Sequence, residues 1–309
     1  MNLIKQTLGR NVSHLSGVAT YRLVCIAFVL ATMLLSGCAL TTEERFLAMK
    51  QDGGTQGFTP VSFGAAPPLV GMLRAQKSTQ NAPDNLWVVI EGDGRAWLNM
   101  REPSFDPTPV DAAGWRLAKG ISKSTVLYLA RPCQYISQVE LDACSIDDWT
   151  SARFAEKWVG RLNAAINEAK RTTRAKNIVL AGYSGGGVMA ALIAARRDDV
   201  AMLITVASPL DHAAWTTYHR VSPLTGSLNA LEVRERLFRL PQIHVVGDDD
   251  KVVPPVLLQN FLRAYPTDAP AELVILPGVD HRMRTPIDLS RIRSSRSLLP
   301  SIDGRDTYP

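Results

Sequence analysis

Six short apolar runs without polar alternation recur along the chain. They are rich in β-branched residues and lie at 86–90, 125–130, 177–181, 201–207, 242–246 and 272–276. A strand buried on both faces carries such a continuous run, so the pattern indicates strands of a parallel sheet. Stretches of helical periodicity lie between them, most clearly at 151–171, where apolar positions recur at Phe154, Trp158, Leu162, Ala165 and Ile166. The alternation predicts an α/β fold, a mostly parallel central sheet with helices on both faces.

The stretch 211–240 interrupts this alternation. Aromatic and apolar residues, Trp215, Tyr218 and Leu224 among them, precede a charged run of helical character at 231–239. We expect a small cap insertion over a pocket. The composition, 46% hydrophobic and 20% charged, is that of a globular protein. Because no linker divides the remainder, we expect one domain at 71–285.

The N-terminal segment has the pattern of an export signal. Lys5, Arg10 and Arg22 precede an uncharged run at 23–37, which ends immediately before Cys38. A run of this length falls short of the roughly 20 apolar residues that a spanning helix needs. We therefore interpret 1–37 as a signal peptide, with a retained membrane anchor as the alternative.

The end of this segment, Leu-Ser-Gly-Cys at 35–38, resembles the bacterial lipobox. The resemblance implies that Cys38 is acylated after cleavage and holds the protein on a lipid bilayer. It also implies an exported lipoprotein that faces the periplasm or lies on the cell surface, and Ala39 after the cysteine goes with delivery to the outer membrane. We expect 38–70, which contains Pro60, Gly64, Pro67 and Pro68, to be the lipidated N-terminus and a tether.

Charge argues against a nucleic-acid partner. Removal of 1–37 takes away three of the 34 basic residues and none of the 29 acidic ones, which leaves 31 against 29, a net charge of +2. Much of the basic surplus lies near the C-terminus, which holds six arginines from Arg282 onward. Nucleic-acid binding therefore has no support. We expect 286–309 to be a solvated basic tail, with contact to anionic lipid as the alternative.

Two of the four cysteines, Cys133 and Cys144, remain once Cys25 and Cys38 are assigned to the export signal. An exported protein matures where disulfides persist. We therefore expect a Cys133–Cys144 disulfide, and two buried free thiols are the alternative.

Ser184 is the candidate nucleophile. It follows the apolar run at 177–181 and precedes small residues that open an apolar helix. A sharp turn between strand and helix exposes a serine hydroxyl but needs glycine on both sides, and Gly182 with Gly185 or Gly186 meets this need.

A serine nucleophile needs a base, and the base needs an acid to orient it. Three carboxylates, Asp248, Asp249 and Asp250, follow the run at 242–246, and His281 follows the last run. The other four histidines lie in the signal, the cap region or a strand, so His281 is the candidate base.

With these residues in order, the chain from about 86 to 281 resembles the α/β-hydrolase superfamily. The resemblance implies a triad of Ser184, an aspartate and His281. The pattern Gly-x-x-Asp-x-Val-Val-Pro selects Asp250 as the acid. Asp249 and Asp248 are alternatives, and so is Asp211, which stands where some relatives carry the acid.

An acyl-transfer site also needs two N–H donors for the oxyanion. Gly185 supplies the first, and Asp93 or Gly94, in the loop that follows the run at 86–90, supplies the second. Glu91 stands where relatives carry histidine, so we expect Glu91 and Asp93 to need neutralising partners, for which Arg95 or Arg131 would serve. A purely structural turn is the alternative.

The phrases at 106–109 and 129–135 resemble those of uncharacterised proteobacterial hydrolase lipoproteins. No residues are spaced as metal ligands or as a phosphate loop, so we expect no metal and no cofactor.

The sequence thus predicts an exported, membrane-anchored serine hydrolase that cleaves a small-molecule carboxylic ester through an acyl-enzyme. Trp97, Trp215 and Tyr218 are candidates for an apolar pocket, or simply packing residues. A serine peptidase or amidase would use the same triad. A non-catalytic envelope lipoprotein that uses the fold as a binding scaffold is the alternative that Glu91 suggests.

Overall fold

The structure is a computed structural model that describes residues 40–76, 83–99 and 101–291 of the 309-residue chain. The chain divides into two compact units, Met1–Thr41 and Thr42–Pro309, and every helix and strand named below belongs to the second. The predicted signal peptide and the lipidation site Cys38 lie outside the described residues. No helix in the described ranges is both long enough and apolar enough to cross a bilayer.

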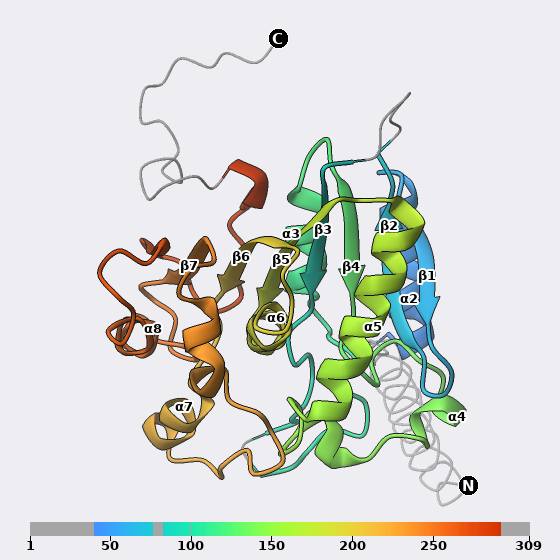
Figure 1. The fold of residues 1–309 in the computed structure, drawn as a ribbon. Coiled ribbons are helices and arrows are strands. Elements are labelled where there is room, and N and C mark those ends of the chain that lie inside the picture. The colour runs from blue at the N-terminus through green and yellow to red at the C-terminus, as the bar shows by residue number, and fades with distance from the viewer. Residues whose placement is uncertain (1–39, 77–82, 100, 292–309) are drawn as a thin grey trace, which may run out of the picture. The chain divides into compact units, whose positions relative to one another are not determined.

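An eight-stranded sheet forms the centre of the second unit, in the order β1-β2-β4-β3-β5-β6-β7-β8 (Figure 1). Strands β3 to β8 run parallel, while β1 and β2 are antiparallel at one edge. The strands are β1 (Thr59–Phe63), β2 (Leu69–Arg74), β3 (Asn85–Ile90), β4 (Thr125–Leu129), β5 (Asn177–Tyr183), β6 (Val200–Val206), β7 (Gln242–Gly247) and β8 (Ala271–Leu276). All six predicted strands are confirmed, and so is the fold class.

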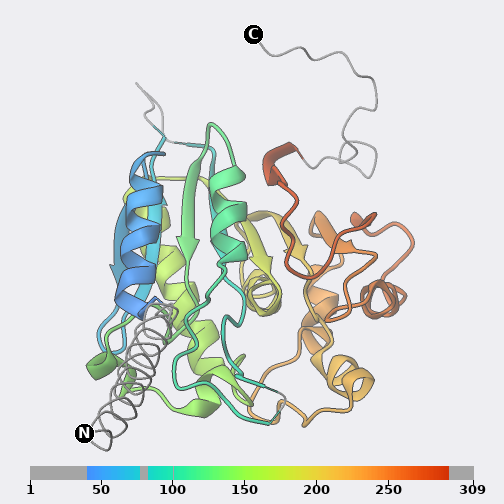
Figure 2. The same ribbon diagram turned by 180° about the vertical axis from the view of Figure 1, so that it is seen from behind.

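Helices cover both faces of this sheet. In Figure 1, α5 and α6 lie in front of it, and Figure 2 shows α2 and α3 in front of the other face. The helices are α2 (Thr42–Gly54), α3 (Ala113–Gly120), α4 (Gln138–Leu141), α5 (Glu156–Thr173), α6 (Gly185–Ala194), α7 (His212–His219) and α8 (Pro255–Leu262), with short 3-10 helices η1 (Ile146–Trp149), η2 (Ala230–Leu237) and η3 (Leu289–Arg291).

The predicted helix at 151–171 begins later than expected, at Glu156. Trp158, Leu162 and Ile166 form its buried face as predicted, but Phe154 is buried in the turn before it. Residues on an irregular segment can fall into helical spacing by chance, so the periodicity extended the prediction by about one turn too many.

The tether predicted at 38–70 is wrong for residues 42–70, which form α2, β1 and the start of β2. Trp115 of α3 shows why: its Nε1–H donates to Asp52 at 2.9 Å and its ring packs edge-on against buried Phe58. Pro60 lies on edge strand β1, the part of a sheet that tolerates proline. The folded domain therefore begins at Thr42 and not at 71.

The C-terminal boundary expected at 286 is also too early. Ile287 and Leu289 are buried in the hydrophobic core, and η3 follows from Leu289. Residues 292–309, which make up most of the predicted basic tail, lie outside the described residues.

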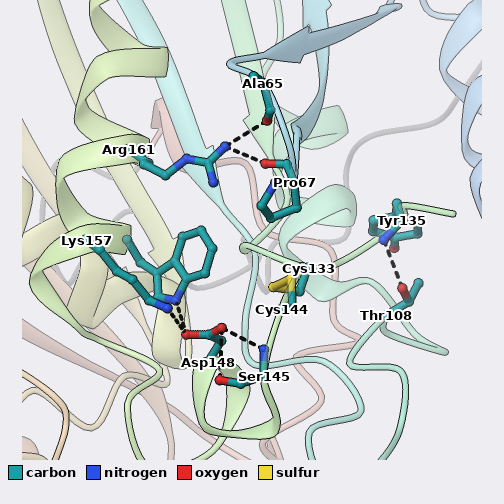
Figure 3. The surroundings of a disulfide bond; sticks show 11 residues. Ala65, Pro67, Thr108, Cys133, Tyr135, Cys144, Ser145, Asp148, Lys157 and Arg161 are labelled. Atoms are coloured by element: carbon teal, nitrogen blue, oxygen red, sulfur yellow. Dashed lines mark hydrogen bonds and ion pairs between the residues drawn. A yellow bond between two sulfur atoms is a disulfide. The ribbon is translucent and has the colours of Figure 1, made fainter. Parts of the chain in front are cut away.

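The Cys133–Cys144 disulfide is formed, with its two Cα atoms 6.3 Å apart (Figure 3), so the predicted pairing is confirmed. The loop that it closes is fastened to the rest of the domain. Within it, Tyr135 N donates to Thr108 Oγ1 at 2.9 Å. Just after it, Asp148 of η1 accepts a hydrogen bond from Trp158 Nε1 of α5 at 2.9 Å. The loop is therefore fixed to the segment that follows β3, where the candidate site lies, and η1 fixes its C-terminal end to α5.

Candidate active site

A cleft of about 510 Å³ lies where the carboxyl ends of the parallel strands meet. Its lining includes Gly94 after β3, Ser184 after β5, His212 of α7 and His281 after β8. Ligand sites of parallel α/β sheets are built at this edge, because the loops that leave the strands converge there.

Ser184 lies on the sharp turn between β5 and α6. Its backbone has φ 50° and ψ −122°, a strained conformation for a residue with a side chain. Gly182 and Gly186 make the turn possible: a Cβ on Gly182 would lie 2.2 Å from the Gly186 carbonyl oxygen, and one on Gly186 would lie 2.2 Å from that of Ile90. Strand, turn and helix thus occur in the order predicted for a nucleophilic serine.

His281 and Asp250 form a hydrogen-bonded pair, with His281 Nδ1 2.8 Å from Asp250 Oδ2. The Asp250 carboxylate is fully buried, and its other oxygen accepts hydrogen bonds from the backbone of Val252 and Val253 at 2.8 and 2.7 Å. An acceptor on this side assigns the proton of a neutral ring to Nδ1 and leaves Nε2 free to accept a proton.

Tyr183, beside the candidate nucleophile, holds His281 from a second direction. Its hydroxyl donates to the His281 carbonyl oxygen at 2.8 Å, and the two rings lie 5.4 Å apart. Burial, assisted by the charges of Glu91 and Asp250, raises the pKa of Tyr183, so the phenol remains a donor. Sequence reasoning missed this residue, because the position between Gly182 and Ser184 is variable in the motif.

The N–H groups predicted to bind an oxyanion lie in two segments. Gly185 is the first residue of α6, where an N–H has no partner within the helix. In the loop after β3, Gly92 N donates to Glu91 Oε1 at 2.8 Å and is therefore occupied. The N–H groups of Asp93 and Gly94 donate no hydrogen bond within the described residues. Both residues predicted as the second donor therefore have an N–H group that is not occupied within the described residues.

Glu91 has neither of the arginine partners expected for it. Its carboxylate is buried and accepts hydrogen bonds from the backbone N–H groups of Gly114 and Trp115 at 2.9 and 3.1 Å and from the Tyr128 hydroxyl at 3.1 Å. Burial raises the pKa of Glu91 against the lowering effect of these donors. The N-terminus of α3 is a favourable place for a carboxylate, so Glu91 has a structural role there.

Asp93 has two arginine partners, Arg131 at 2.9 Å and Arg153 at 2.6 Å, both themselves buried. Burial opposes ionisation of Asp93, but the charges of Arg153 and Arg131 outweigh it and hold the pKa of Asp93 below its usual range. Arg131 was predicted. The side chain of Arg95, the other candidate, makes no hydrogen bond or ion pair within the described ranges, and Arg153 was missed.

This cluster lies against the first residue of α6, since a Cβ on Gly185 would lie 2.0 Å from Asp93 Oδ1. Two guanidinium groups contact this one carboxylate, and the charge of Glu91 also acts on Arg131. Arginine side chains beside Gly185 favour an oxyanion that develops at its N–H.

Comparison with known proteins places the fold. No protein-family model matches the chain, and no curated protein is significantly similar to it in sequence. Among solved structures, Est1E from Butyrivibrio proteoclasticus with ferulic acid bound is similar at a TM-score of 0.51 and 17% identity, over 72% of this chain and 91% of that chain. The fold is that of the α/β-hydrolases.

Two other solved structures with this hydrolase fold match less well. The esterase PF2001 of Pyrococcus furiosus has a TM-score of 0.49 at 13% identity, over 73% of this chain and 83% of that chain. An alpha-beta serine hydrolase homologue from Coxiella burnetii has a TM-score of 0.46 at 18% identity, over 72% and 88%.

Three other aspartates were predicted as alternative acids of the hydrolase triad, and each has a different environment. Asp211 caps α7, accepting from the backbone N–H groups of Ala213 and Ala214, both at 3.1 Å. Asp248 accepts from Gly278 N at 2.7 Å, and the side chain of Asp249 is exposed. Only Asp250 of the four, all within the described residues, has a hydrogen bond to His281.

Ser184 and His281 line the same cleft of the hydrolase fold, although no hydrogen bond joins their side chains in the part of the chain that the structure describes. Such hydrogen bonds are often long without substrate and tighten when it binds. The described residues contain no group of three or more His, Cys, Asp or Glu side chains placed to hold a metal ion.

The cap predicted at 211–240 consists of α7 and η2, so the charged run expected as helical is a 3-10 helix. Trp215 of the cap lines the cleft and donates from Nε1 to the Val252 carbonyl oxygen at 2.7 Å. Trp97 also lines the cleft, whereas Tyr218 lies outside that lining, as far as the described residues go, and is about half exposed. Two of the three aromatic candidates therefore reach the site.

Proposed function

We propose that this protein is a serine hydrolase of small carboxylic esters. The observation that carries the proposal is that Ser184, on its strained turn, shares a cleft with His281, whose Nδ1 is hydrogen-bonded to buried Asp250. This is the arrangement of nucleophile, base and acid that acyl transfer requires.

In the proposed reaction His281 Nε2 takes the proton of Ser184 Oγ while Oγ bonds to the ester carbonyl carbon. The oxyanion that results accepts hydrogen bonds from Gly185 N–H and from the N–H of Asp93 or Gly94. Asp250 stabilises the imidazolium. The proton then passes to the leaving alkoxide as the ester C–O bond breaks, and the alcohol departs. A water molecule, deprotonated by His281, hydrolyses the acyl-enzyme and restores Ser184.

The size of the cleft favours a small ester over a polypeptide. A volume of about 510 Å³ falls in the range of sites that enclose a small molecule. Its lining includes the exposed apolar side chains Trp97, Val110 and Val252. Apolar walls around a few polar groups suit an ester with a bulky apolar part.

We also propose that the enzyme is an exported lipoprotein held on the outer membrane through acylated Cys38. The lipobox resemblance supports this, and the disulfide is of a kind that persists outside the cytoplasm. Since α2 begins at Thr42, only three residues separate Cys38 from the folded domain. Membrane fractionation should find the wild type with the outer membrane and a Cys38→Ser variant absent from it; the same distribution for both would contradict the anchor.

Labelling with a fluorophosphonate probe tests the catalytic proposal. The wild type and a control variant, Ser122→Ala at an exposed serine, should each take up one probe molecule by intact mass, and Ser184→Ala should take up none. Equal labelling of Ser184→Ala, or no labelling of the wild type, would contradict a Ser184 nucleophile. The second outcome would favour the non-catalytic scaffold instead.

A further inference from the structure

Large apolar side chains are exposed in the segment that follows β3. Four of them, between 40% and 76% exposed, are Trp97, Leu98, Phe105 and Val110. Trp97 and Val110 also line the cleft, so these side chains begin at its mouth. Exposed apolar side chains that lie together on a surface mark a site of contact with lipid or with another protein. We call these four residues the apolar rim.

The apolar rim is brought together by a short hairpin. Trp97 pairs with Pro103 in an antiparallel bridge, and Ser104 N donates to the Ala96 carbonyl oxygen at 3.0 Å. Phe105 follows directly and is therefore held near Trp97. The rim thus lies on one segment of defined backbone structure.

The first turn of α2 is fastened to the same segment. Thr42 Oγ1 donates to the Asp106 carboxylate, and Arg45 Nη1 donates to the Thr108 carbonyl oxygen at 2.8 Å. Asp106 and Thr108 lie between Phe105 and Val110 of the rim in the sequence. Figure 2 shows α2 beginning at the end of the domain toward which β4 points, and the cleft lies at that end.

Chain length places the proposed anchor close to the rim. Cys38 precedes Thr42 by four residues. An extended chain spans at most about 3.6 Å per residue, so the acylated residue lies within about 14 Å of Thr42. Thr42 is in turn hydrogen-bonded to the residue after Phe105. An anchor inserted in a bilayer therefore holds the rim near the lipid surface, where its apolar side chains gain by leaving water.

The charges of the hairpin suit a phospholipid surface. Residues 95–105 carry two arginines, Arg95 and Arg101, against one acid, Glu102. Both arginines are exposed, and neither forms an ion pair within the described ranges. Lipid phosphates are natural partners for such guanidinium groups.

We propose that the apolar rim docks on the lipid bilayer and that the cleft opens onto the membrane. The inference rests on the proposed anchor at Cys38, and it names a substrate class for the proposed hydrolysis: apolar esters dissolved in the bilayer. Such an ester reaches Ser184 past the rim without crossing water.

A fluorophore attached beside the cleft tests the docking. The acylated full-length mature protein is placed in vesicles of phosphatidylethanolamine and phosphatidylglycerol. Cys133 and Cys144 form the disulfide, so Phe105→Cys supplies the free thiol for an apolar, environment-sensitive probe. Lipids with a nitroxide on the acyl chain should quench this probe. The control is Val256→Cys in α8, which is 40% exposed and packs on β7 and β8 at the other edge of the sheet; its probe should stay unquenched.

Hydrolysis in the same vesicles tests the route of the substrate. The double variant Leu98→Ser/Phe105→Ser alters two rim residues that do not line the cleft, so kcat/KM for water-soluble 4-nitrophenyl acetate should equal that of the wild type. For 4-nitrophenyl laurate held in the vesicles, kcat/KM should fall about tenfold, because two large apolar side chains no longer enter lipid. The control Val256→Ser/Ile275→Ser, at two other exposed apolar residues, should change neither value. Thermal unfolding confirms that the variants are folded.

The outcomes separate this inference from the proposals on which it rests. Quenching at 105 alone, with no hydrolysis of either ester by the wild type, would support the docking and overturn the esterase. Equal quenching at both positions, or none at 105 in the acylated protein, would overturn the docking and leave the anchor. A probe at 105 shielded from water but not quenched would indicate a protein partner or a second copy and would also overturn it. Equal losses for both esters would overturn the route from the bilayer. An intact mass without acyl chains would overturn the anchor and the docking together.

Discussion

Replacement of Asp93 by asparagine tests the ion-pair cluster beneath the oxyanion donors. The Asp93 oxygens lie 2.9 Å from Arg131 and 2.6 Å from Arg153, whose side chains are only 5% and 8% exposed. Asparagine keeps the size of the side chain but removes its charge. Two buried guanidinium groups would then lose the carboxylate that both of them contact.

The expected loss in free energy of unfolding is large for a substitution that exchanges a single carboxylate oxygen. Breaking a buried ion pair by removing one partner costs about 3–5 kcal/mol, because it leaves an uncompensated buried charge. That is a substantial part of the roughly 5–15 kcal/mol that stabilises a typical domain. The exposed pair Lys176–Asp84 provides the control: its distance is also 2.9 Å, but its side chains are 68% and 78% exposed. For Asp84→Asn we expect a loss of at most about 1 kcal/mol.

Acid should shrink the effect of Asp93→Asn. The pKa of Asp93 is lower in the folded protein than in the unfolded one. The carboxylate therefore contributes its full stabilisation above the unfolded pKa of about 3.9, and this contribution is lost as the pH falls through the folded pKa. The free-energy difference between wild type and Asp93→Asn should be constant around neutral pH and decrease below about pH 4.

Urea titration of the oxidised wild type, Asp93→Asn and Asp84→Asn, at neutral and acid pH, measures these free energies of unfolding. If Asp93→Asn lost no more stability than Asp84→Asn at neutral pH, the argument from burial would be refuted. A difference that grew as the pH fell would refute the assigned direction of the pKa shift.

Three further predictions concern the site and its supports. Asp250→Asn should lower kcat by about 10³–10⁴-fold, because it removes the carboxylate that orients His281. Asp249→Asn, at an exposed side chain, should not change kcat. Equal losses in the two variants would mean that Asp250 is not the acid of the triad. Gly182→Ala should prevent soluble folding, because its Cβ would lie 2.2 Å from a carbonyl oxygen. The control Gly160→Ala, in α5 with open space around it, should raise the free energy of unfolding in urea titration by up to about 1 kcal/mol. A soluble, active Gly182→Ala protein would contradict the packing argument. Reduction of the disulfide, which closes a loop of sequence separation 11, should lower the free energy of unfolding by about 3 kcal/mol, and unchanged urea curves with and without reductant would count against it.

The parallel strands were predictable because burial on both faces leaves a continuous apolar run in the sequence. The antiparallel edge was not. Strand β1 is mostly exposed and carries Pro60, so neither its hydrophobicity nor its composition distinguishes it from a linker. Its place in the sheet depends on pairing with β2 and on the packing of α2 against Trp115, and both are tertiary contacts.

The candidate triad was predictable to a similar depth. Ser184 is indicated by the glycines that its turn requires. Asp250 is indicated by a local pattern that includes Val252 and Val253, the residues whose N–H groups bind its carboxylate. No sequence pattern indicated the role of Arg153. It meets Asp93 from 60 positions away in the sequence, and only the folded chain brings the two side chains together.

The two segments proposed to bind the oxyanion are positioned by one set of contacts, although they follow different strands. Gly186 approaches the carbonyl oxygen of Ile90 at the end of β3, and Gly185 lies against the Asp93 carboxylate. Asp93 is in turn fixed by Arg131, whose backbone N–H is held by Gln134 in the disulfide loop. Movement of the loop after β3 would therefore separate Asp93 from its counter-ions and open the packing at the turn of Ser184 at once. Both costs oppose that motion, so the distance between the two proposed oxyanion donors is set before substrate binds, as electrostatic preorganisation requires.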